Sequence, residues 1–76
     1  MVYLWRFRRF PDRGVDPKSL RILLYLKNHG PHTSREIART LGYSPNFIRR
    51  VLQRLRRLGA VEVYLKPSRG LEDFQE

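Results

Sequence analysis

The chain has 76 residues and a formal net charge of +9, from 16 Lys and Arg against 7 Asp and Glu. A chain this short buries only about 60% of its unfolded surface, which predicts a single domain over residues 1–76 and excludes a second core. With no cysteine, a disulfide framework and a Cys-based metal site are excluded, and no apolar run approaches the roughly 20 residues of a membrane span.

At the N-terminus, aromatic residues alternate with other side chains. Tyr3, Trp5 and Phe7 recur every second position over residues 2–7, which predicts a strand with one aromatic face. The interleaved aromatic and basic side chains could also stack on exposed bases or hold a second subunit. For a domain this small, a strand that covers the core or pairs across a dimer is the favoured interpretation.

A loop with proline and glycine leads to the first predicted helix, over residues 17–28. Asp16 is its N-cap, Pro17 suits the first helical position, and Gly30 followed by Pro31 closes it. The apolar residues of this segment predict a broad buried face: Leu20, Ile22, Leu23, Leu24 and Leu26.

The second predicted helix begins with a capping box between Thr33 and Glu36 and ends at Gly42. Only one residue separates that glycine from Ser44, the N-cap of a third helix over 45–58. The apolar spacing gives the third helix a buried stripe: Ile48, Val51, Leu52, Leu55 and Leu58.

A strand is predicted over residues 60–65, with Val61, Val63 and Leu65 on one face. The next residues form a basic turn that contains Lys66 and Arg69, and residues 71–74 could return as a second short strand. Such a hairpin would be the wing of the domain.

The second and third predicted helices, joined by a tight turn, resemble a helix-turn-helix. Ala38 is small where the helices cross, Gly42 permits the turn, and Ile48 packs the third helix on the second. The segments SPNFIRRV (44–51) and LRRLGAV (55–61) resemble the recognition helix and first wing strand of prokaryotic regulators such as the MarR, ArsR and TrmB-like families, including viral or plasmid-borne ones. The resemblance covers residues 17–71 and implies an α+β winged helix, in which a three-helix core carries an N-terminal strand and a short C-terminal β-hairpin.

The outward side of the third helix concentrates positive charge. The helical wheel places five arginines and no acid there, and arginine supplies 13 of the 16 cations of the chain. A helix that repels itself in this way is best explained by a polyanionic partner. We expect contacts to base edges from Asn46, Arg49, Arg50 and Gln53, and contacts to phosphates from Arg54 and Arg57.

The resemblance adds candidate residues at the helix starts and the wing. It implies that these residues lie near the DNA backbone or the minor groove: Thr33, Ser34, Arg35, Ser44, Pro45, Phe47, Lys66 and Arg69. For Thr33, helix capping alone is the favoured explanation. The wing tip is short, so two interpretations of Lys66 and Arg69 are equally favoured: insertion into a groove, and simple exposure to solvent.

Together these features predict a DNA-binding transcription regulator that places helix 45–58 in the major groove of double-stranded DNA, as a cytoplasmic, nucleoid-associated homodimer. A winged-helix interaction module in a transcription or replication assembly and an RNA-binding winged helix remain open alternatives. The scattered acids and the isolated His29 and His32 predict no enzyme, no metal and no cofactor, and no small-molecule ligand is evident.

Overall fold

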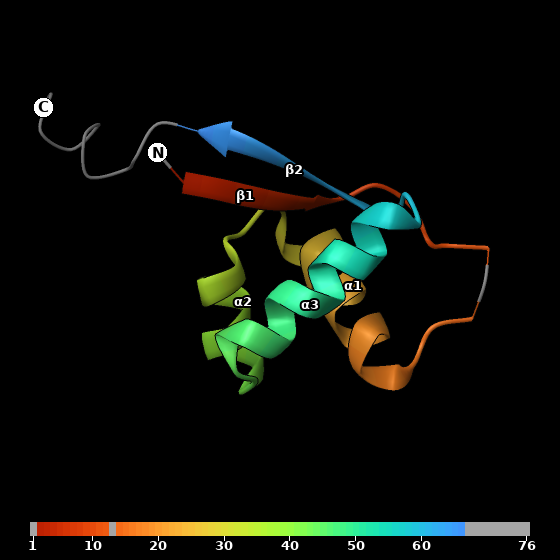
Figure 1. Cartoon of the computed structure of the whole chain (residues 1–76), viewed down its shortest axis with the longest axis horizontal. Coiled ribbons are helices and arrows are strands. Elements are labelled where there is room, and N and C mark those ends of the chain that lie inside the picture. Colours follow the sequence, from red (N-terminus) through yellow and green to blue (C-terminus); the bar gives the residue numbers. More distant parts are fainter. Residues whose placement is uncertain (1, 13, 67–76) are drawn as a thin grey trace, which may run out of the picture.

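Three capped helices and two strands make up the part of the chain that the computed structural model describes, which is residues 2–12 and 14–66 (Figure 1). The elements in order are β1 (Val2–Phe7), α1 (Pro17–His29), α2 (Ser34–Leu41), α3 (Pro45–Arg57) and β2 (Val61–Lys66). This α+β arrangement confirms the predicted order of strand, three helices and strand. The predicted return strand over 71–74 and Arg69 lie outside the described residues.

The helix boundaries follow the predicted caps. Thr33 Oγ1 accepts from the Glu36 amide at 3.1 Å, and the Glu36 carboxylate accepts from the Thr33 amide at 2.9 Å, so the capping box is present. Gly42 ends α2 in the left-handed conformation, with φ of 78°, which permits the tight turn into α3. The helix-turn-helix geometry therefore rests on local sequence signals.

The core lies where the three helices meet the sheet. Its buried cluster consists of Trp5, Ile22, Leu23, Leu26, Ile37, Ala38, Ile48, Val51, Leu52, Leu55, Ala60 and Val61. The predicted stripe of α3 is confirmed, although Leu58, the C-cap residue of the helix, is only half-buried.

The broad apolar face predicted for the first helix is wrong in part. Leu20 and Leu24 are each 39% exposed, because the core-facing side of α1 is narrower than its run of apolar residues. Ser19 is buried instead, at 1% exposure, and its hydroxyl donates to Asp16 Oδ1 at 2.7 Å. That hydrogen bond removes the cost of burying the hydroxyl.

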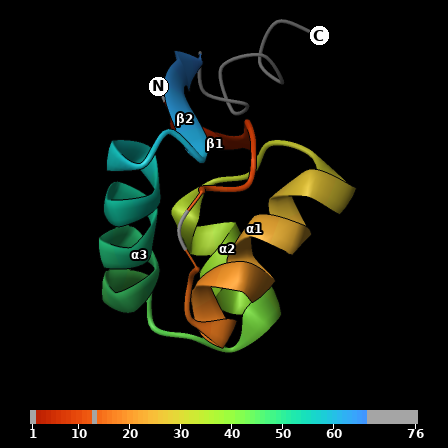
Figure 2. The ribbon, with the colours of Figure 1, turned by 90° about the vertical axis from the view of Figure 1, so that its right-hand side faces the viewer.

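The two strands pair antiparallel, from Phe7 opposite Val61 to Val2 opposite Lys66, and we call this pair the ribbon. Figure 2 shows the ribbon across one end of the three helices, with α3 on one side of the molecule and α1 on the other. Backbone hydrogen bonds between Trp5 and His32, of 2.8 and 3.1 Å, tie the ribbon to the start of the helix-turn-helix.

The predicted strand at the N-terminus covers the core, as expected, but its aromatic face is not uniform. Trp5 is 5% exposed and belongs to the core cluster, whereas Tyr3 is 60% exposed. A hollow lined by Val2, Tyr3 and the residues at the start of α2 lies beside that end of the ribbon, so no residue of the ranges 2–12 and 14–66 covers Tyr3 there. The buried Leu4 shows that the other face of β1 is partly covered as well.

Candidate nucleic-acid interface

The position of α3 is fixed at its start by a hydrogen bond and at its inner side by packing. Ser44 Oγ accepts from the Phe47 amide at 3.2 Å, and Pro45 occupies the first turn. Ile48, Leu52 and Leu55 are each 0% exposed. This packing leaves the opposite face of α3 free to present its polar side chains to solvent.

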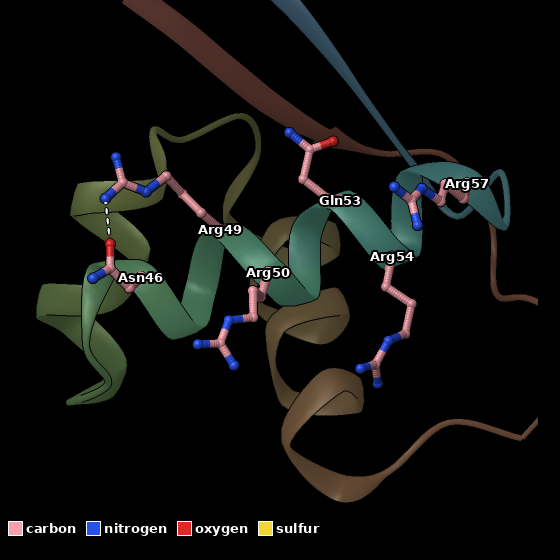
Figure 3. A pocket seen from close by; sticks show the side chains of 6 residues that line it. All are labelled: Asn46, Arg49, Arg50, Gln53, Arg54 and Arg57. Atoms are coloured by element: carbon pink, nitrogen blue, oxygen red, sulfur yellow. Dashed lines mark hydrogen bonds between the residues drawn. The ribbon is translucent and has the colours of Figure 1, made fainter.

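Six exposed side chains line an open hollow along that face, which we call the outer hollow: Asn46, Arg49, Arg50, Gln53, Arg54 and Arg57. In Figure 3, Gln53 points toward the strands and Arg49 extends back toward Asn46, whereas Arg50 and Arg54 point to the opposite side, away from the strands. The structure thus brings together the six residues that the sequence analysis assigned to base and phosphate contacts, and divides them into two flanks.

Asn46 and Arg49 are joined by a hydrogen bond. Arg49 Nη2 donates to Asn46 Oδ1 at 2.6 Å (Figure 3). The residues are three apart on an exposed helix, a spacing that places side chains side by side. Asn46 therefore holds the Arg49 guanidinium near the start of α3 (Figure 3).

The outward face of α3 is positively charged and has no acidic side chain to balance it, because residues 45–57 contain five arginines and no Asp or Glu. On the ribbon, Glu62 forms a salt bridge with Arg6 and a second one with Arg8, whose Nε lies 3.7 Å from Glu62 Oε2. The Ser19 hydrogen bond lowers the pKa of Asp16, with a smaller contribution from the charge of Arg54. These acids have partners in the ribbon and in the cap of α1, and the outer hollow remains cationic.

Phe47 lies away from the outer hollow. It is half-buried, and its ring meets the Tyr43 ring edge to face at 5.3 Å. Lys18 Nζ sits 5.5 Å from the Phe47 ring, and Arg21 donates to the Tyr43 hydroxyl at 3.3 Å. Phe47 thus braces the turn before α3, and two cations of α1 approach that turn, which the sequence analysis did not foresee.

A second hollow lies between α3 and the ribbon, and we call it the ribbon groove. It is lined by Tyr3, Trp5, Ser34, Arg49, Gln53, Arg56 and Val63. The hollow beside Tyr3 continues past Thr33 and Ser34 to Arg35. Of the predicted residues at the start of α2, Ser34 therefore lines the ribbon groove and Arg35 lines the hollow between β1 and α2, while the Thr33 hydroxyl is used in the cap.

Arg56 was not among the candidate residues, yet it lines the ribbon groove with Arg49 and Gln53. The sequence contains a signal for this position, because residues 49, 53 and 56 follow i, i+4, i+7 spacing and therefore share one stripe of the helix. Lys66 is the exposed last residue of β2, at the end of the ribbon where Val2 is its partner.

Among the described residues, no group of three or more His, Cys, Asp or Glu side chains could hold a metal ion. None of the helices in that part of the chain has the length and apolar character needed to cross a membrane.

A family model described as the MarR family matches residues 13–70. The match includes all three helices and β2. Among curated proteins and among solved structures, no match was found.

Proposed function

Because the chain belongs to the MarR family of winged helix-turn-helix transcription regulators, we propose that it binds double-stranded DNA by inserting α3 into the major groove. Members of this family are regulators rather than enzymes. The observation that carries the proposal is the outer hollow, where every charged side chain is an arginine. The major groove of B-DNA is wide enough to admit one α-helix, and arginine suits both guanine edges and phosphates.

Roles follow from position along α3. The first turns of a recognition helix lie deepest, so Asn46, Arg49, Arg50 and Gln53 contact base edges. The later Arg54 and Arg57 contact phosphates. The residues at the helix starts approach the DNA backbone: Thr33, Ser34, Arg35, Ser44, Pro45 and Phe47. Lys66, at the end of the ribbon, and Arg69 approach the minor groove. We treat residues 1–76 as one DNA-binding domain.

We further propose that the protein acts as a homodimer in the cytoplasm, bound to the nucleoid. Two copies would place their α3 helices on half-sites about one DNA turn apart. The exposed Leu20 and Leu24 on the outer side of α1 offer an apolar contact for a second copy. DNA reduces the repulsion between two chains of net charge +9.

The test is a titration of labelled duplex DNA, matched single-stranded DNA and duplex RNA across a salt series, followed by selection of bound duplexes from a random pool. Tighter binding of duplex DNA, a steep salt slope and an enriched palindromic motif support the proposal. Equal binding of RNA would point to an RNA-binding domain, because the narrow major groove of A-form RNA excludes α3. No nucleic-acid binding would point to a protein-interaction module.

A further inference from the structure

The ribbon groove has a chemistry of its own. Arg49, Gln53 and Arg56 form its α3 wall, Ser34 lies at its α2 side, and Tyr3 is on the ribbon. Among the residues that line it in the described part of the chain, none is acidic. Because Arg49 is assigned to base edges, the groove offers a phosphate diester the Arg56 guanidinium together with neutral hydrogen-bond donors.

The geometry of duplex DNA gives the groove a definite place in a complex. A phosphate backbone separates the major groove from the adjacent minor groove. In a complex with α3 in the major groove and the Lys66 end of the ribbon toward the minor groove, that backbone ridge must cross the space between α3 and the ribbon. The ribbon groove, which is lined by residues of both α3 and the ribbon, occupies that space.

The neighbouring hollow extends the same path. Tyr3 and Ser34 line both hollows, and Arg35 lies at the far one. A backbone that follows this path meets Arg56, then Ser34, and then Arg35. Successive cations along a groove are typical of surfaces that track a nucleic-acid strand.

We infer that the ribbon groove seats the phosphate backbone of one DNA strand, with Arg56 as the phosphate-binding residue that completes it. The inference rests on the proposed function and deepens it, because it assigns a role to the ribbon and to an arginine outside the base-reading set. Arg56 then contributes affinity that does not depend on DNA sequence.

The test compares Arg56→Gln with Lys27→Gln in the full chain. Both changes remove one positive charge, but Lys27 lies on α1, across the molecule from α3 (Figure 2), where it sits 5.9 Å from the Phe10 ring. Each variant is titrated with a mixed-sequence duplex and with the selected duplex across a salt series. A second set of duplexes carries one neutral methylphosphonate at successive backbone positions.

We expect Arg56→Gln to weaken binding to both duplexes by the same factor of about ten. It should also reduce by about 0.9 the slope of log binding constant against log salt concentration. Lys27→Gln should change neither quantity by a comparable amount. One methylphosphonate position that weakens binding by the wild type should have no further effect on Arg56→Gln.

The inference is overturned if Arg56→Gln matches Lys27→Gln, or if Arg56→Gln stays as sensitive as the wild type at every methylphosphonate position. In either case duplex binding by the wild type leaves the proposed function standing. Absence of duplex binding by the wild type overturns both.

Discussion

Asn46 and Arg49 should act on DNA as a coupled pair rather than as two independent contacts. The 2.6 Å hydrogen bond between Arg49 Nη2 and Asn46 Oδ1 is exposed, so its net contribution to folding is small, about 0.5 kcal/mol or less. Its contribution to binding is larger, because it holds a long, mobile guanidinium in one orientation before the DNA arrives. Ordering such a side chain costs about 0.5–1.5 kcal/mol.

The perturbation is a double-mutant cycle with Asn46→Ala, Arg49→Ala and the double variant. We expect Arg49→Ala to lose about 1–3 kcal/mol on the selected duplex and much less on a mixed-sequence duplex. Asn46→Ala should lose its own base contact and, in addition, about 1 kcal/mol, since Arg49 must then be ordered on binding. The double variant should therefore lose about 1 kcal/mol less than the sum of the two single losses, and this difference is the coupling energy.

The assay is fluorescence anisotropy with labelled duplex at fixed salt, and urea unfolding serves as the control for stability. Both residues are exposed, so unfolding free energies should stay within about 0.5 kcal/mol of the wild type. Additive losses on the selected duplex would refute the positioning of Arg49 by Asn46. Equal losses on both duplexes would refute base reading by Arg49.

Three further predictions concern folding. Trp5→Ala should cost about 3–5 kcal/mol in urea unfolding, because the side chain is 5% exposed in the core cluster. Gly42→Ala should cost about 1–2 kcal/mol in the same assay through strain at a φ of 78°, since no atom lies within 4 Å of the added Cβ; an unchanged midpoint would contradict this. The pKa of Asp16 is lowered in the folded state by the Ser19 hydrogen bond, so its stabilising effect is present above the ordinary carboxyl pKa and is lost as the pH falls through the folded value. The difference in stability between wild type and Asp16→Asn, measured by urea unfolding across acid pH, should shrink in that range, and a constant difference would argue against the assignment.

Helix boundaries were predictable because their signals are local. Asp16, Thr33 and Ser44 each cap a helix in the structure, and a cap needs only a side chain and an amide two or three residues away. The α3 face was predictable for a related reason. Its buried residues repeat at helical spacing, so the wheel also defines the outward set, including the stripe that contains Arg56.

What could not be predicted depends on contacts distant in sequence. The alternation of apolar and other residues indicates a strand over residues 61–66, but it does not show that Phe7 lies opposite Val61. The exposure of Leu20 and Leu24 likewise reflects how α2 and the ribbon approach α1. The ribbon groove arises from the same pairing, and so its lining residues, drawn from four elements, were not assembled by sequence reasoning.

The charge pattern of α3 is unfavourable for folding, and this supports a binding role for it. No acid stands in the first turn of α3, and Arg54 lies four residues after Arg50 and three before Arg57, spacings at which like charges on a helix repel. The arginines of the last turn are better placed, since they lie at the negative end. Burial of Ile48, Leu52 and Leu55 offsets the repulsion. Mutually repelling cations on the solvent side of a helix have a physical reason when a polyanion neutralises them, and the start of α3 is the part that enters deepest into the proposed DNA groove.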